Sequence, residues 1–373
     1  MTLKQVEKQT KKVVYLLGAG ATQAEASLKD ESIRIQMQDI KDGMLLAMRD
    51  RKMRGLAEVK NELANEASDV EHLITLYEYT GNKKHNRIAN ILKELFSTEI
   101  QIRVGKLGPN YQPRLLTALI DMHKIPDLCE DLIGIITINY EDLIERAFQL
   151  VKGGINYSVE MIGEHSRLKL NQNIEPILKL HGSFNWMNQH PLSLTDEEKM
   201  SPGDVLWIPP GVEKRRERYP FSIVWGRARE ILVCDILRII GCSLNRNDWQ
   251  LISLLYTTQK LNIQRRAYLI ELINYIEEGE RAKGDYSYLS FRLISEIKEV
   301  REYLAKSFAV EATDSDKLSK DIVKTLSSKS NSRMNVFDTW LRSKGESMRD
   351  NGIDLTTDKN IFKRYIFNEA EAS

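Results

Sequence analysis

The segment VVYLLGAGAT, residues 13–22, joins an apolar run to a glycine-rich turn. Five consecutive apolar residues without polar alternation are typical of a strand that is buried on both faces of a sheet. Gly18 and Gly20 permit a tight turn, and a helix that starts there offers free N–H groups to an anion such as a pyrophosphate. The segment therefore predicts the first strand of a parallel α/β sheet with an anion site at its end.

Similar apolar runs predict further strands of this sheet. They lie at residues 133–138, 176–180, 205–208, 238–241 and, as the last strand, 267–270. Between about 31 and 125, apolar residues recur at helical spacing, which predicts a helical insertion after the first strand. The fold expected is α/β: a Rossmann-like parallel sheet with helices on both faces.

The end of the chain has a different pattern, which suggests a division into residues 1–285 and 286–373. The second part is expected to be mostly helical, with Leu293 on one apolar stripe. Its Ser-, Lys- and Asp-rich stretch 311–333 is interpreted as a mobile linker. Aromatic residues near the C-terminus indicate a short helical piece that packs on the rest of the protein.

Composition excludes several classes of protein. There are 54 basic and 53 acidic residues, so no overall field favours nucleic acid or a membrane surface. The N-terminus is polar, and no apolar run is long enough to span a bilayer. Cys129, Cys234 and Cys242 show neither CxxC spacing nor a disulfide framework, so we expect no zinc and a cytoplasmic location.

Polar or glycine-rich residues follow four of the predicted strands, and such strand ends meet in one crevice of an open α/β sheet. Besides the glycine turn they include Asn139, His181 and the stretch that begins at Gly241. Asn139 either caps the next helix or holds a ribose hydroxyl or a water. His181 is either structural or a general base, with space beside its ring left by Gly182 and Ser183.

Jointly, these segments resemble the sirtuin superfamily in order and rough spacing, over residues 13–275. The matching motifs are GAGAT (18–22), TINYEDLIE (137–145), KLHGSFNW (179–186) and GCSLNRNDW (241–249). The forms KLHGSFNW and NYEDLIE look more like bacterial sirtuin-like proteins of anti-phage defence than like protein deacylases. Some proteins of that group are large oligomers paired with a HerA-type ATPase. The resemblance therefore suggests a homo-oligomer with such a partner.

The resemblance also implies roles for individual residues. Asn139 and His181 match the catalytic pair of the family, and Asn139 would also touch the ribose. The other expected NAD contacts are Gly18, Ala19, Gly20, Ala21 and Thr22 around the phosphates, Asp142 near Asn139, and Gly241, Ser243 and Leu244 around the adenosine.

Three departures from the family pattern change the expected reaction. The zinc-binding cysteine pairs are absent, and Glu25-Ala26-Ser27-Leu28 replaces a Pro-Asp-Phe-Arg segment. Both argue against an acetyl-lysine peptide, which leaves water as the acceptor. We expect a gated NAD glycohydrolase that forms nicotinamide and ADP-ribose, with NAD as substrate, acting in defence by NAD depletion. Asn139-Tyr140-Glu141 replaces the family's Asn-Tyr-Asp, so either Glu141 or Asp142 could support Asn139.

Three alternatives were weighed. A subunit of a helicase-associated complex, with or without a nuclease, could sense NAD or ADP-ribose without turnover. A nuclease in its own right is disfavoured because no carboxylate cluster has metal-ligand spacing. A dehydrogenase is disfavoured because Gln23 stands where the dinucleotide motif has glycine, and because Asp39 lies in a helical context.

Overall fold

A computed structural model describes most of the chain. It covers residues 10–50, 57–65, 70–80, 82–162, 167–189, 191–196, 203–209, 216–265, 268–295, 335–353 and 360–367. The linker predicted at 311–333 lies outside these ranges. Within them, no helix combines the length and apolar character needed to cross a bilayer.

A six-stranded, fully parallel sheet organises the fold. Its spatial order is β3-β2-β1-β7-β8-β9, which in chain order reads 3-2-1-4-5-6, the doubly wound Rossmann arrangement. The bounds are β1 Lys11–Leu17, β2 Glu130–Thr137, β3 Ile177–Lys179, β7 Ile236–Ile240, β8 Leu269–Ile273 and β9 Phe291–Ile294. The Rossmann-like parallel sheet predicted from the sequence is confirmed.

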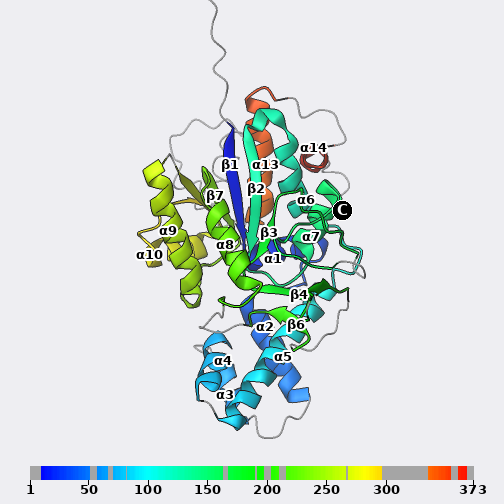
Figure 1. Cartoon of the computed structure of the whole chain (residues 1–373), viewed down its shortest axis with the longest axis vertical. Helices are drawn as coiled ribbons and strands as arrows, with labels where there is room; N and C mark the ends of the chain where they lie inside the picture. Colours follow the sequence, from blue (N-terminus) through cyan, green and yellow to red (C-terminus); the bar gives the residue numbers. More distant parts are fainter. Residues whose placement is uncertain are drawn as a thin grey trace, which may run out of the picture.

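Helices cover both faces of this sheet, as predicted (Figure 1). On one face α1 and α6 pack together with α7 and the C-terminal helices. On the other, α8 lies against β2 and β3. The bounds are α1 Ala19–Lys29, α6 Arg114–Asp121, α7 Leu143–Lys152, α8 Phe221–Ile231, α9 Trp249–Arg265 and α10 Ile276–Asp285.

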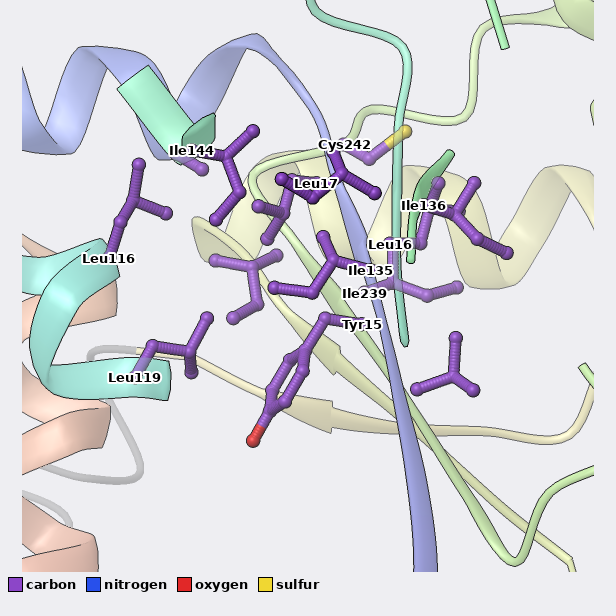
Figure 2. Close-up of a cluster of buried hydrophobic side chains, with 14 of the residues drawn as sticks. Tyr15, Leu16, Leu17, Leu116, Leu119, Ile135, Ile136, Ile144, Ile239 and Cys242 are labelled. Carbon is purple, nitrogen blue, oxygen red and sulfur yellow. The ribbon is translucent and has the colours of Figure 1, made fainter. Parts of the chain in front are cut away.

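The central strand β1 anchors the main core. From Val13 to Leu17 its side chains are at most 2% exposed, because neighbouring strands and both helical layers enclose it. Figure 2 shows Leu16 and Leu17 among Ile135 and Ile136 of β2, with Leu116 of α6 to one side. A strand without polar alternation has no face to turn toward water, which is why this run predicted the sheet.

The helical insertion forms a second core below the sheet edge in Figure 1. Its apolar stripes face inward as predicted, with Ile40, Met44, Ile74 and Leu92 all at most 2% exposed. The helices are α2 Met37–Asp50, α3 Ala57–Ala64, α4 Val70–Tyr79 and α5 Lys83–Gly105.

A small antiparallel sheet covers this second core, and here the sequence reading was wrong. Residues 205–208 were expected in the parallel sheet, yet β6 pairs with β4 in the order β5-β4-β6. Phe184, Val205 and Trp207 face the insertion helices, so a short apolar run is buried here without a parallel neighbour. The bounds are β4 Gly182–Met187, β5 Ser193–Leu194 and β6 Val205–Trp207.

The C-terminal part is mostly helical, with one correction. Leu293 was expected on a helical stripe but lies on the strand β9. Because β9 is a sixth strand of the sheet, the strand predicted at 267–270 is not the last one. Beyond it, α13 Val336–Asp350 and α14 Ile361–Phe367 contact α6. Trp340 and Phe362 are buried in the main core, as the C-terminal aromatics predicted.

A buried ion network ties the sheet together beneath α13. Arg238 of β7 donates to both Glu130 oxygens, at 2.5 and 2.7 Å, and to Glu271 of β8 at 2.8 Å. Trp340 of α13 lies over the guanidinium at 5.4 Å. Burial alone would raise the pKa of Glu130, but the bonds and charge of Arg238 outweigh it and hold that pKa at about 2.

This network predicts acid sensitivity. The pKa of Glu130 is lower in the folded protein than its ordinary value, so its stabilisation is complete above about pH 4.5 and is lost as pH falls toward about 2. Glu130→Gln should lower the free energy of unfolding at pH 7 by roughly 3 kcal/mol and should flatten its pH dependence in that window. Chemical denaturation at several pH values measures both effects.

The matched control is Glu230→Gln, which removes an exposed ion pair with Arg227 and should change stability by less than about 0.5 kcal/mol. Equal effects of the two substitutions would contradict the assignment of the buried network.

Candidate functional site

The four predicted strand ends meet, and hydrogen bonds join them. Gly20 N donates to Gly241 O at 2.8 Å, which links the end of β1 to the end of β7. Asn139 Nδ2 donates to Gly18 O at 3.0 Å, which links the ends of β2 and β1. Leu180 N donates to Thr137 O at 2.9 Å, which brings the segment before His181 alongside β2. The carboxyl edge of the sheet therefore gathers all four segments in one place.

The glycines of the turn are required by backbone packing. A Cβ at Gly18 would lie 2.6 Å from the Cα of Cys242, and one at Gly20 would lie 2.7 Å from the Cα of Gly241. Gly241 has a φ of +60°, and its Cβ would reach within 2.3 Å of Ala21 N. The close approach predicted for phosphates is thus already made by protein backbone.

This packing narrows the anion site at the start of α1. The N–H groups of Gly20 and Ala21 donate to the carbonyls of Gly241 and Gly18. Ala19 is exposed, and its N–H has no hydrogen bond within the described part of the chain. A phosphate at this turn can therefore bind the N–H of Ala19 and the positive end of the α1 dipole.

Asn139 is held by its amide nitrogen. Besides Gly18 O, Nδ2 donates to the Thr22 hydroxyl at 2.9 Å, and that hydroxyl donates to Glu141. Both amide protons are therefore used, which leaves Oδ1 as the hydrogen-bonding group that Asn139 can present to a ligand. Asn139 does not cap the following helix, since the N-cap of α7 is Asp142.

The two acidic residues after Asn139 are placed differently. Glu141 accepts from Thr22, and so it supports Asn139 through one hydroxyl. Asp142 pairs with Arg146 at 2.8 Å, one turn along α7. Among the residues that the structure describes, no bond joins Asp142 to Asn139. The Asp142 carboxylate therefore takes no part in the hydrogen bonds that hold the Asn139 amide.

A buried lysine supports the same loop, and the sequence reasoning passed over it. Lys179 Nζ, fully buried at the end of β3, donates to Glu141 O and to Glu145 at 2.7 Å. Tyr157 donates to the same Glu145 oxygen at 3.0 Å. Burial raises the pKa of Glu145, and the charge of Lys179 opposes that rise. The only sequence signal was a lysine in an otherwise apolar strand.

His181 is 3% exposed, and its ring lies beside Asp248. His181 Nε2 is 3.7 Å from Asp248 Oδ1, and Asp248 is itself 7% exposed. Asp248 lies on a short 3-10 turn, Arg246–Asp248, directly before α9. This acidic partner is a residue that the sequence reasoning missed, although it falls inside the GCSLNRNDW motif. A carboxylate at this distance restricts the orientation of the imidazole ring.

The residues after His181 serve packing, which corrects the expectation that they leave space beside the ring. Gly182 has a φ of +74°, and a Cβ there would lie 2.4 Å from Leu206 O on β6. Ser183 donates its hydroxyl to Tyr140 O at 2.8 Å. Tyr140 in turn lies near His181, with 6.3 Å between the ring centroids. Gly182 is thus needed for the approach of β4 to β6.

The segment after β7 is a tight loop with local strain. Leu244 is 2% exposed and has a φ of +50°, a conformation that a branched side chain adopts at a cost of roughly 1–2 kcal/mol. Ser243 is exposed beside it. Asn245 caps the 3-10 turn and accepts a hydrogen bond from Asn247 N at 3.2 Å.

A polar contact of α4 joins the helical insertion to this loop. Asn247 Nδ2 donates to Glu71 Oε2 of α4 at 2.9 Å, and both side chains are buried. Burial raises the pKa of Tyr140 well above its usual value, and the charges of Glu71 and Asp248 add to the rise. The insertion therefore contributes charge and a hydrogen bond close to His181.

Two cavities border the strand-end segments. One of about 100 Å³ is bordered by Tyr140, Glu141, Asp142, Arg146 and Asn185, among others. Another of about 500 Å³ lies beside α9. Neither is lined by Asn139 or His181. Within the described ranges, no group of three or more His, Cys, Asp or Glu side chains is placed to hold a metal ion.

Part of the chain matches a known protein family. Residues 133–272 match the family model described as the SIR2-like domain. The match includes Asn139, His181 and Gly241, while the glycine turn lies before it and is joined to it by hydrogen bonds. A SIR2-like domain implies an NAD-dependent enzyme and supports a sirtuin-like family.

Other comparisons add little. A solved structure described as Sir2Tm bound to a propionylated peptide is 13% identical, with a TM-score of 0.36, and covers 81% of this chain and 95% of that one. This likeness is too weak to bear on the reaction. A search of curated proteins returned no match.

The contact between the two glycine segments yields a prediction. Gly241→Ala should lower the free energy of unfolding by at least about 2 kcal/mol, because it adds both a clash with Ala21 N and strain at positive φ. Gly226→Ala is the control: it lies exposed within α8 with open space around it, and should raise stability by about 0.5–1 kcal/mol. Thermal or urea unfolding compares the two. A neutral Gly241→Ala would show that the strand ends do not pack this closely.

Proposed function

We propose that the protein hydrolyses the bond between nicotinamide and ribose in NAD, giving nicotinamide and ADP-ribose. The observation that carries the proposal is the fixed amide of Asn139. Its two protons are bound by Gly18 and Thr22, so its Oδ1 is a positioned acceptor next to the His181 segment. An acceptor oxygen can orient a water or a ribose hydroxyl, and both are required for this reaction.

The chemistry needs little more from the protein. Nicotinamide leaves as a neutral molecule from a cationic ring, through a transition state that resembles an oxocarbenium ion. Asn139 would hold the ribose or the attacking water, and His181 would accept the proton of that hydroxyl or water. Water forms the new bond to the anomeric carbon as the bond to nicotinamide breaks. The acceptor is taken to be water because the cysteine pairs and the Pro-Asp-Phe-Arg segment of deacylating relatives are missing from the sequence.

The rest of NAD would lie along the linked strand ends. The exposed N–H of Ala19 and the dipole of α1 suit a phosphate. Gly241, Ser243 and Leu244 would follow the adenosine half, with Gly18, Gly20 and Thr22 shaping the wall. Asp142 forms an ion pair with Arg146. We therefore propose that Asp142 contributes only through this ion pair, next to Glu141, and not by binding NAD directly.

Such an activity would exhaust the NAD of a cell, so we propose that it is gated. Asn247 donates to Glu71 of the helical insertion, and the next residue, Asp248, lies beside His181. The insertion is therefore connected to His181 through this turn. The resemblance in the sequence further suggests a role in anti-phage defence, self-assembly and a HerA-type ATPase partner. Mass measurement with and without a co-encoded ATPase tests the assembly directly.

The central test is loss of nicotinamide release. Asn139→Ala and His181→Ala should each lower turnover by roughly 100-fold or more, since each removes a group that acts on the reacting atoms. Chromatographic measurement of nicotinamide, with circular dichroism to verify folding, reads the result. Asn188→Ala, which removes a polar side chain directly after β4, is the control. Undiminished turnover in either variant would remove that residue from the site, whereas NAD binding without release in the unmodified protein would favour a sensing subunit.

Asp248 is proposed to position His181, and this makes a separate prediction. Asp248→Asn keeps the size of the side chain but removes its charge, so it should lower kcat roughly tenfold with little change in KM. Glu280→Gln, at an exposed pair with Lys283, is the charge-removing control and should leave both constants in place. A rise in KM with kcat unchanged would mean that Asp248 does not position His181.

A further inference from the structure

The cavity of about 500 Å³ beside α9 borders the fourth strand-end segment, and its lining does not include Asn139 or His181. Its lining includes Arg246, Trp249 and Tyr256 from the start of α9 and the turn before it. Tyr286 and Tyr288, which follow α10, close the other side. A volume of this size accommodates a small ligand of the dimensions of a nucleotide.

The walls of this aromatic cavity are held in place by the protein itself. Gln259 of α9 donates to Tyr288 O and accepts from Ser290 N, both at 2.9 Å. The Tyr256 and Tyr288 rings meet edge to face, with centroids 5.0 Å apart. Because backbone bonds fix the segment after α10 to the helix, the cavity exists before any ligand arrives, which lowers the entropic cost of binding.

One polar group in the wall is unsatisfied. Tyr286 is 7% exposed, and its hydroxyl is buried with no hydrogen-bond partner among the described residues. Buried hydroxyl groups in folded proteins nearly always have a partner. A ligand with a carbonyl or ring nitrogen at its edge would supply one.

The remaining groups indicate the class of ligand. Trp249 is 53% exposed and Tyr288 48%, so flat aromatic surface faces the solvent at the cavity. Arg246 bonds Asp285 through Nε and Nη2, and its Nη1 takes no part in that pair. Stacking surface, a buried hydroxyl and a guanidinium at the mouth match a planar heterocycle that carries a phosphate.

We propose that this cavity binds a nucleobase with its phosphate, at a site distinct from the proposed NAD crevice. The base would stack against Trp249 and Tyr288 with its polar edge at Tyr286, and the phosphate would lie near Arg246. Arg246 and Asp248 share one 3-10 turn, and Asp248 lies 3.7 Å from His181. A nucleotide bound here would therefore act on the same turn that contacts the proposed catalytic histidine.

Binding can be measured without turnover, so the test is independent of the proposed hydrolase activity. The full chain is titrated with AMP and, in a parallel arm, with a deoxyadenosine oligonucleotide, by calorimetry and tryptophan fluorescence. Because NAD itself carries adenine and phosphates and can enter such a cavity, the two sites are separated by variants of the cavity lining and not by competition with NAD. AMP should bind with one molecule per chain. The arm with the higher affinity identifies a free nucleotide or single-stranded nucleic acid as the source of the base.

Variants locate the ligand. Trp249→Ala should weaken AMP binding by at least tenfold and Tyr286→Phe by roughly fivefold. Ile263→Ala is the control, because it lies on α9 outside the cavity lining and is 59% exposed. Unchanged AMP affinity in Trp249→Ala would overturn the proposal, as would equal effects of all three substitutions. No binding in either arm, with a change of oligomeric mass in Trp249→Ala, would instead make this surface a protein interface.

Discussion

The close backbone contact between the turn after β1 and the turn after β7 is the constraint on which the rest of the site depends. Gly20 N donates to Gly241 O, and no Cβ fits at either position. This contact holds two central strand ends together at the edge of the sheet. It also fixes Gly18 O, to which the Asn139 amide is bound. The orientation of Asn139 therefore follows from a steric requirement for glycine two strands away.

The sequence predicted most of the sheet because five of its strands are apolar runs that have to be buried on both faces. It failed where burial has another origin. Val205 and Trp207 of the run at 205–208 are buried by the insertion helices, and a short apolar run does not indicate which neighbour covers it. Leu293 was assigned to a helix because it falls on an apolar stripe with helical spacing, and the short, partly buried strand β9 has no long apolar run to indicate a strand.

In the candidate site, too, some features could be predicted from the sequence and others could not. Residues at strand ends were found because parallel strands bring their carboxyl ends together whatever the side chains are. The partners of those residues were not found, because hydrogen-bond partners depend on angles that sequence spacing does not contain. Thr22 was assigned to phosphates, whereas its hydroxyl joins Asn139 to Glu141. Asp248 and Lys179 gave no signal of their own, since an acidic residue before a helix and a lysine in a strand are both common.

Buried charge near the site explains why the loop after β2 can hold a defined shape. Lys179 is enclosed at the end of β3, and it bonds both Glu145 and the Glu141 carbonyl. A buried lysine that lost Glu145 would be left with an uncompensated charge, which costs roughly 3–5 kcal/mol. Any other position of the 139–145 segment would carry that cost. The lysine thus restricts the loop to one arrangement, while the insertion reaches the opposite side of the site through Glu71 and Asn247. The insertion thus contacts the 3-10 turn beside His181, whereas Asn139 is held separately by Gly18 and Thr22.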